Sequence, residues 1–297
     1  MCGIAGLIGT EKYKEQDVKK MINKIDYRGP DEQGTIDLDN IYLGHARLAV
    51  VDPENGTQPM SNHDKTVWVV FNGEIYNHIE IRNRLIKKGY KFKSRCDTEV
   101  LVHLWREKGI NMIEDLIGMF AFCLWDTKQE KGILVRDRQG IKPCYLTFFN
   151  DGSFAFASEI KSLLTLDGFQ IEIDDISLNL LHSFNYCLPP RTCYKNIFHL
   201  MPGTYIEFNR KGFQKEYKYW KWPLAKEKKD IDLDNLNEII DESIKLQMRF
   251  DVKGCLFLSG GVDSSLIAAH LSKQWNRDKI LAFSLNSREE GYGEYHL

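Results

Sequence analysis

Short apolar runs separated by turn residues fill the chain from Cys2 to about residue 208. Runs of this kind, bounded by Gly, Asn and Asp, predict β-strands. The clearest are IYLGHARLAVV, TVWVVFNGEIY, MFAFCLWD, KGILVRDR, CYLTFF and SFAFASE. Three stretches, 16–25, 78–88 and 98–108, repeat apolar residues at helical spacing and predict helices. Helices that cover sheets give an α+β domain of stacked antiparallel sheets with flanking helices over residues 2–208.

The pattern changes after residue 208. Residues 209–232 are polar, aromatic and lysine-rich, with Pro223 near the middle, and are typical of a connector. Residues 233–297 then follow the order helix, apolar strand (CLFL), SGGVDSS, amphipathic helix and second strand (ILAFSL). A strand, a crossover helix and a second strand form a βαβ unit of a parallel sheet. We therefore predict the start of an α/β nucleotide-binding domain, incomplete because two strands leave apolar surface uncovered.

Composition and charge narrow the class of protein. Of 297 residues, 43% are hydrophobic and 28% are charged, which excludes global disorder. A net charge of -2 gives no excess of positive charge that would attract nucleic acid or an anionic membrane. No uncharged run approaches the roughly 20 residues of a membrane span. The seven cysteines show no C-x-x-C or zinc spacing, so we expect neither a disulfide framework nor a structural metal. These features favour a cytoplasmic protein.

The SGGVDSS segment has the composition of a phosphate-binding loop. Gly260 and Gly261 allow a tight turn, and Ser264 stands at the start of a helix whose free N–H groups and dipole favour an anion. The lysine of a Walker A loop is absent, whereas Asp263 is placed to hold a metal-bridged pyrophosphate. A glycine turn with a serine N-cap is the alternative interpretation. The full seven residues between an apolar strand and an amphipathic helix favour phosphate binding.

The opening MCGIAGLIG places Cys2 directly behind the initiator methionine on an apolar stretch. One interpretation is packing, with Cys2 as a small hydrophobe on a strand. The other is chemical, because removal of Met1 gives Cys2 a free α-amine beside its own thiol. An amine with a pKa of about 7.7 to 8.0 can act as a base near neutral pH. Residue type alone leaves both interpretations open.

Motifs spread over the first domain resemble those of class II glutamine amidotransferase domains, which are N-terminal-nucleophile hydrolases with an αββα fold. In chain order they are MCGI, YRGPD, GHARLAVVD, FNGEIYN, CDTEV, GMFAF, RDRQGIKP and FASEIKSL. SGGVDSS resembles the loop of the ATP pyrophosphatase group, whose members cleave ATP between the α- and β-phosphates. Both halves in this order resemble the glutamine-hydrolysing asparagine synthetases over nearly the whole chain.

The resemblance implies a ligase with glutamine amidotransferase activity. In such an enzyme glutamine is hydrolysed to glutamate and ammonia, and the ammonia is transferred to aspartate activated as β-aspartyl-AMP. ATP becomes AMP and pyrophosphate in the activation step. The implied substrates are glutamine, aspartate and ATP, Mg2+ is the implied metal, and a homodimer is compatible with the family.

The resemblance also assigns roles to residues of this chain. Cys2 is the implied nucleophile, while the Asn72 side chain and the Gly73 backbone N–H are implied donors to the oxyanion. The implied glutamine-binding residues are Arg47, Leu48, Val50, Val51, Glu74 and Asp97. The implied ATP-binding residues are Leu258, Ser259, Gly260, Gly261, Asp263, Ser264 and Leu285. On local grounds, an Asn-Gly hairpin turn is the alternative for residues 72 and 73.

The synthetase domain of this family is several times larger than residues 233–297, and the chain stops at Leu297. We therefore expect a fragment or a truncated gene product in which glutamine hydrolysis survives and asparagine formation does not. Two alternatives stay open. The chain is an amidotransferase that serves another acceptor, or it is a non-catalytic glutamine-binding or regulatory partner of a full-length synthetase.

Overall fold

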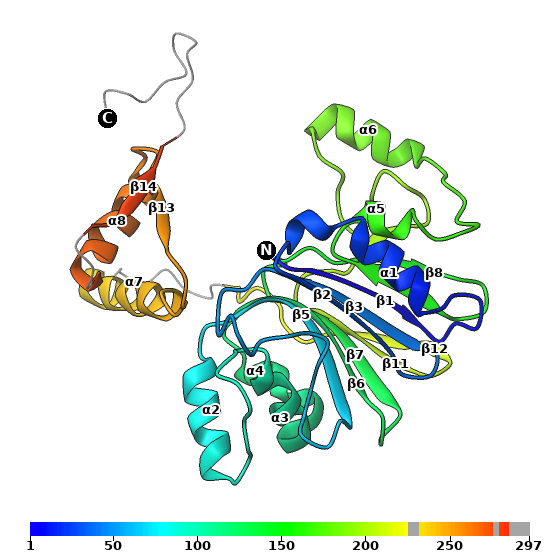
Figure 1. Cartoon of the computed structure of the whole chain (residues 1–297). Helices are drawn as coiled ribbons and strands as arrows, with labels where there is room; N and C mark the ends of the chain where they lie inside the picture. The colour runs from blue at the N-terminus through cyan, green and yellow to red at the C-terminus, as the bar shows by residue number, and fades with distance from the viewer. Residues whose placement is uncertain (225–231, 276–278, 285–297) are drawn as a thin grey trace. The chain divides into compact units, whose positions relative to one another are not determined.

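The chain divides into two compact units, Met1–Pro223 and Leu224–Leu297 (Figure 1). The computed structural model describes residues 1–224, 232–275 and 279–284. Within these ranges, no helix is both long enough and apolar enough to cross a membrane.

Two six-stranded sheets form the centre of the first unit, and all their strand pairs are antiparallel. The first sheet has the order β10 (Phe198–His199), β8 (Tyr145–Phe148), β9 (Phe154–Ala157), β1 (Gly3–Ile8), β3 (Ile41–Arg47) and β2 (Glu32–Asp37). The second has the order β12 (Gly212–Lys218), β11 (Thr204–Asn209), β7 (Lys131–Arg136), β6 (Gly118–Asp126), β5 (Val67–Ile75) and β4 (Met60–Ser61). The apolar runs of the sequence form these strands because β-branched and aromatic side chains pack well on pleated, buried surfaces.

Helices cover the outer faces of the two sheets (Figure 1). The helices of the first unit are α1 (Glu15–Asn23), α2 (His78–Lys87), α3 (Glu99–Lys108), α4 (Met112–Asp115), α5 (Ile160–Leu163) and α6 (Asp175–Phe184), with 3-10 turns at Asp26–Arg28 and Gly109–Asn111. In α3 the buried side chains include Val100, Leu101, Leu104 and Trp105, which recur at helical spacing. The helices predicted at 16–25, 78–88 and 98–108 correspond to α1, α2 and α3.

Three apolar clusters separate four layers of secondary structure. One cluster joins α1 and α5 to the first sheet, and it includes Met21 and Leu163. A second lies between the two sheets, where Phe154 meets Phe208. The third joins the second sheet to α2, α3 and α4. The order helix, sheet, sheet, helix is the expected αββα arrangement, so the predicted α+β class is confirmed for the first unit.

The first unit continues beyond residue 208, where the sequence pattern predicts a connector. Residues 212–218 form β12, which pairs with β11 at the edge of the second sheet. Most β12 side chains are exposed, so this segment can be polar although it is a strand. A polar edge strand limits pairing with other chains, and its composition resembles that of a connector.

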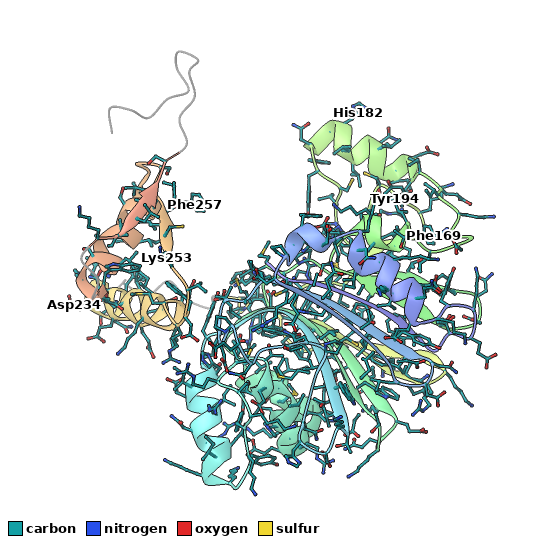
Figure 2. The ribbon with its side chains drawn as sticks, viewed as in Figure 1. Phe169, His182, Tyr194, Asp234, Lys253 and Phe257 are labelled. Atoms are coloured by element: carbon teal, nitrogen blue, oxygen red, sulfur yellow. The ribbon has the colours of Figure 1, made fainter. Side chains whose placement is uncertain are left out.

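The second unit contains α7 (Leu233–Gln247), β13 (Cys255–Phe257), α8 (Val262–Gln274) and β14 (Leu281–Phe283). The two strands are parallel neighbours, which is the predicted βαβ order. A 2.7 Å hydrogen bond between His270 Nδ1 and Asp241 Oδ1 connects helices α7 and α8. Apolar side chains of the strands remain exposed, among them Phe257, which is 79% exposed (Figure 2).

Candidate active site

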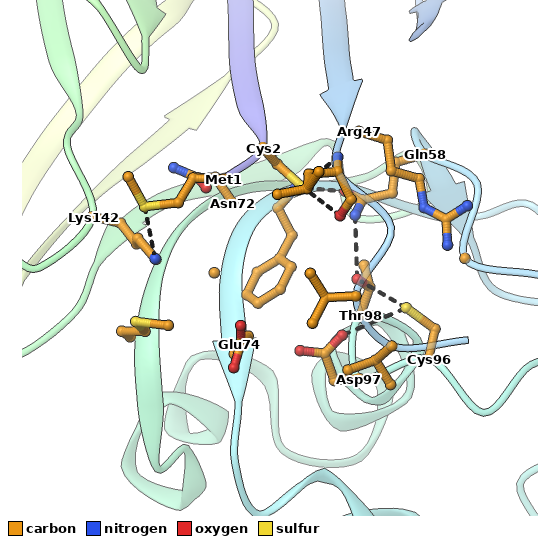
Figure 3. A pocket seen from close by; sticks show the side chains of 17 residues that line it. Met1, Cys2, Arg47, Gln58, Asn72, Glu74, Cys96, Asp97, Thr98 and Lys142 are labelled. Atoms are coloured by element: carbon orange, nitrogen blue, oxygen red, sulfur yellow. Dashed lines mark hydrogen bonds between the residues drawn. The ribbon is translucent and has the colours of Figure 1, made fainter. Parts of the chain in front are cut away.

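A pocket forms in the first unit where strands of both sheets end (Figure 3). Cys2 immediately precedes β1, and Arg47 is the last residue of β3, which pairs with β1 through Gly3 and Ala46. Asn72 and Glu74 come from the second sheet, where they follow Val70 on the same face of β5 because side chains alternate along a strand. The layering of the sheets therefore gathers residues that are far apart in the sequence.

The cavity has a volume of about 130 Å³, and every residue predicted for the glutamine site lines it. The predicted residues in its wall are Cys2, Arg47, Leu48, Val50, Val51, Asn72, Gly73, Glu74 and Asp97. Residues without a predicted role complete the wall, namely Met1, Gly56, Gln58, Phe71, Cys96, Thr98, Met119 and Lys142.

Cys2 is half-buried, and its sulfur faces the cavity rather than the apolar core. The Leu48 backbone N–H donates to Cys2 Sγ at 3.3 Å, and the thiol lies 3.6 Å from the Leu48 carbonyl oxygen. Burial raises the pKa of the Cys2 thiol, while the Leu48 hydrogen bond opposes this shift. The Arg28 guanidinium donates to the Cys2 carbonyl oxygen at 2.9 Å and pairs with Glu159, which fixes the backbone at this point. Cys2 therefore lines the cavity, and its role as a nucleophile stays a prediction.

Asn72 carries a buried amide with no hydrogen-bond partner for either Oδ1 or Nδ2 among the described residues. Its side chain is 1% exposed. Buried polar groups are nearly always satisfied, so an unpaired amide in the wall of a pocket indicates that a ligand completes it. The hairpin-turn alternative is wrong, because Asn72 and Gly73 lie inside the nine-residue strand β5, opposite Ala121 and Phe120 of β6.

Gly73 has a packing role that its sequence motif does not show. A Cβ at this position would lie 2.1 Å from the Met119 carbonyl oxygen and 2.8 Å from Phe120 Cα. No side chain fits there, since contacts this short do not occur. Strand β6 therefore approaches β5 closely behind the pocket, which keeps the Gly73 backbone accessible from the cavity side.

Arg47 is buried, and its guanidinium is held by protein groups. It donates to the carbonyl oxygens of Pro53 at 2.8 Å and Asp52 at 2.9 Å, and it pairs with Glu32 at 3.3 Å. A guanidinium has five N–H donors, so these three bonds leave up to two for a ligand among the described contacts. The fork is rigidly placed in the wall of the cavity.

Two carboxylates and two cationic side chains, Arg47 and Lys142, set the charge of the pocket. Burial raises the pKa of Asp97, whose Oδ2 accepts the Ile75 N–H at 2.9 Å. Burial also raises the pKa of Glu74, and the charge of Asp97 adds to this shift. Burial lowers the pKa of Lys142, whose Nζ donates to Met1 Sδ at 3.1 Å. Paired buried carboxylates favour a bound cation, since a positive charge relieves their mutual repulsion.

Sequence reasoning missed several residues of the wall. Cys96, Thr98 and Lys142 lie inside motifs already recognised, CDTEV and RDRQGIKP, so neighbourhood to those motifs was an available signal. Gln58 had no such signal. Its Oε1 accepts the Phe71 N–H at 2.7 Å and its Nε2 donates to Thr98 Oγ1 at 3.2 Å, contacts that only the folded chain creates.

The predicted phosphate loop lies between β13 and α8. Gly260 adopts a φ of +87°, a conformation that favours glycine, and Ser259 Oγ lies 3.1 Å from Ser264 Oγ. The described loop residues with a predicted ATP role are Leu258, Ser259, Gly260, Gly261, Asp263 and Ser264. Leu285 lies outside the described residues. The hydroxyls and the first turn of α8 are the donor set that a phosphate requires.

Comparison with known proteins agrees with this division. The glutamine amidotransferase domain family matches residues 1–220, and the asparagine synthase family matches residues 235–297. The asparagine synthetase [glutamine-hydrolyzing] 1 of Bacillus subtilis (strain 168) is 35% identical over 99% of this chain and 47% of its own length. A putative asparagine synthetase [glutamine-hydrolyzing] 2 of Methanocaldococcus jannaschii is 32% identical over 96% of this chain and 59% of its own length. The chain thus spans about half the length of the curated relatives it matches.

The fold has solved counterparts as well. The glutamine phosphoribosylpyrophosphate amidotransferase from B. subtilis, complexed with ADP and GMP, has a TM-score of 0.55 and 16% sequence identity, covering 97% of this chain and 67% of that chain. At this identity the likeness concerns the fold alone. The family match over residues 1–220 covers the whole of both sheets and the pocket between them. The chain belongs to the glutamine amidotransferase domain family.

Proposed function

We propose that the first unit hydrolyses glutamine to glutamate and ammonia in the pocket that Cys2 and Asn72 share. The observation that carries this proposal is the unpaired, buried amide of Asn72 in the same cavity as a half-buried thiol. Most buried amides are hydrogen-bonded within the protein, so an amide without a protein partner that lines a cavity is available to a ligand. An amide reserved for a reaction intermediate would be free in the absence of substrate.

In the proposed reaction, removal of Met1 gives Cys2 the free α-amine. The amine takes the thiol proton as the sulfur attacks the side-chain carbon of glutamine, and it then returns the proton to the leaving ammonia. Water hydrolyses the resulting thioester and releases glutamate. The present terminal amine, that of Met1, has a pKa lowered by burial, so this end of the pocket favours an unprotonated amine that can act as a base.

The oxyanion that forms on the carbonyl oxygen is stabilised by the Asn72 amide and the Gly73 N–H. Donors that are already in place cost no reorganisation, and each contributes about 2.7 to 4 kcal/mol to the transition state. Close packing of β5 against β6 behind Gly73 fixes the position of both donors.

The charged groups of the wall fit the two ends of an amino acid. Asp97 and Glu74 provide the negative charge for the α-ammonium group, and Arg47 provides N–H donors for the α-carboxylate. Leu48, Val50 and Val51 line the same cavity. The cavity is small enough to select a single amino acid rather than a peptide.

For the second unit we propose the ATP site of an asparagine synthetase, with aspartate as the acceptor of ammonia. ATP would place its phosphates against the Ser259 and Ser264 hydroxyls and the first turn of α8. Asp263 would hold Mg2+, which neutralises phosphate charge, since Mg2+ sites commonly use one carboxylate together with phosphate oxygens. We place the whole protein in the cytoplasm, because its seven cysteines are free thiols.

The test is a glutaminase assay on protein whose N-terminus has been established by mass spectrometry. Protein that has lost Met1 should release ammonia and glutamate from glutamine, and Cys2→Ala should abolish the release. Cys255→Ala is the matched control, because Cys255 is an exposed thiol of the second unit and its loss should leave turnover unchanged. Glutamine binding without ammonia release would instead support a regulatory partner, and equal activity of Cys2→Ala would refute the catalytic role.

A further inference from the structure

A second group of thiols lies outside the pocket. Cys187 and Cys193 are both half-buried, and their sulfurs are 3.2 Å apart. A disulfide bond is about 2.0 Å long, so the sulfurs need to approach by about 1 Å to bond. Among the described cysteines this is the one recorded contact between two sulfurs. The mechanism proposed above uses neither of them.

Backbone contacts hold the two cysteines together beside the first turn of α6. The Asp174 N–H donates to the Cys193 carbonyl oxygen at 2.9 Å, and the Cys187 thiol lies 3.8 Å from the Ser177 carbonyl oxygen. The Arg191 N–H donates to the Leu188 carbonyl oxygen at 3.2 Å, which closes a turn between the cysteines. These contacts place both cysteines beside the same turn.

The end of this segment that carries Cys193 is also held by side-chain contacts. Arg191 pairs with Asp174 at 2.9 Å, and the neighbouring Tyr194 packs against the apolar cluster under the first sheet. Figure 2 shows Tyr194 on the chain that returns from α6, and His182 on the helix itself. Half-buried sulfurs in a fixed turn are accessible to a small reagent yet remain neighbours.

We propose that Cys187 and Cys193 form a dithiol site that reacts with low-molecular-weight disulfides, such as oxidised glutathione, and closes into an intramolecular disulfide. The thiolate of one cysteine attacks a sulfur of oxidised glutathione, which forms a mixed disulfide and expels one glutathione thiolate. The second cysteine then attacks the protein sulfur of the mixed disulfide and expels the other glutathione thiolate. The two protein thiols lose two electrons and two protons, and oxidised glutathione gains them as two glutathione molecules.

The contact between the two sulfurs also affects the Cys187 thiol. The hydrogen bond with Cys193 raises the pKa of the Cys187 thiol to about 11, and burial adds to the shift. This inference concerns thiol chemistry alone and does not rest on the proposed glutaminase function.

The experiment treats the full chain with oxidised glutathione under native conditions and maps the products by peptide mass spectrometry. The expected product is one disulfide linking Cys187 to Cys193, with two hydrogens lost and no glutathione retained, and reversal by excess reduced glutathione. In Cys187→Ser, Cys193 should instead retain one glutathione group. Cys255 is the internal control, because a lone exposed thiol keeps the group it acquires.

Two outcomes would overturn the inference. One is a wild-type chain that retains glutathione on Cys187 or Cys193 without forming the internal disulfide. The other is a chain in which both cysteines stay reduced while Cys255 reacts. Because the products are read on the wild-type protein, a variant that fails to fold would not affect the conclusion.

Discussion

Replacement of Asn72 by alanine should lower activity without lowering stability. The side chain is buried, and neither atom of its amide has a partner among the described residues. The folded protein therefore bears the cost of an unsatisfied polar group. Asn72→Ala removes that cost together with the proposed donor to the oxyanion.

The two effects have separate magnitudes. Loss of one oxyanion donor lowers kcat by about 100- to 1,000-fold, or about 2.7 to 4 kcal/mol, with little change in KM because the oxyanion exists only in the transition state. An unsatisfied buried group costs about 1 to 3 kcal/mol, and the small cavity left by the amide offsets part of the gain. We expect the free energy of unfolding to stay unchanged or to rise by up to about 2 kcal/mol.

The assay follows glutamate release with a coupled dehydrogenase, and calorimetry follows unfolding. Asn62→Ala is the matched control, because Asn62 is equally buried but its Oδ1 accepts the N–H groups of Thr66 and Val67. That variant should lose about 1 to 3 kcal/mol of stability and keep its turnover. If Asn72→Ala melts at a lower temperature and retains full kcat, Asn72 is a structural residue and the reasoning fails.

Three further changes test the surroundings of the pocket. Gly73→Ala should lower the free energy of unfolding by about 3 kcal/mol in urea denaturation, because the new Cβ would meet the Met119 carbonyl oxygen, and an unchanged midpoint would contradict this. Arg47→Lys should raise KM for glutamine at least about tenfold, because a lysine cannot reproduce the guanidinium fork, whereas a change confined to kcat would argue against carboxylate binding. Burial opposes ionisation of Glu99, but His103, whose Nε2 lies 3.5 Å from Glu99 Oε1, and hydrogen bonds from residues 93 and 94 outweigh it and hold the pKa of Glu99 at about 2. The lowered pKa of Glu99 stabilises the fold by at most about 3 kcal/mol above about pH 4.5, and this stabilisation is lost as the pH falls towards 2. In Glu99→Gln, the free energy of unfolding should therefore depend less on pH in this range, as measured by unfolding at a series of acidic pH values.

Local periodicity made much of the fold predictable. The predicted helices at 16–25, 78–88 and 98–108 differ from α1, α2 and α3 by no more than two residues at either end. A helix that buries one face has apolar residues three and four positions apart. This spacing is visible in the sequence, so the helix can be predicted without knowing which surface it packs against. The proposed glutamine pocket was predictable for a different reason: its residues lie in short motifs that together resemble those of one family.

The missed features all depend on contacts between distant segments. Gln58 is held in the wall of the pocket by hydrogen bonds with Phe71 and Thr98. The residues next to Gln58 in the sequence do not indicate these contacts. Strand β12 is held by its ladder with β11, whereas its own residues are polar enough to suggest a connector. Pairing across a sheet is decided by the neighbouring strand as much as by the segment itself.

Strand β5 belongs to two interiors at once. Val69 and Phe71 pack under α3, whereas Val70 packs between the sheets, and the reactive positions follow directly along the same strand. Loss of packing in either apolar cluster should displace Asn72, because both faces of β5 belong to the same backbone. Heat inactivation and heat denaturation should then trace a single curve, unlike the early loss of turnover seen when the chemistry is carried by a surface loop.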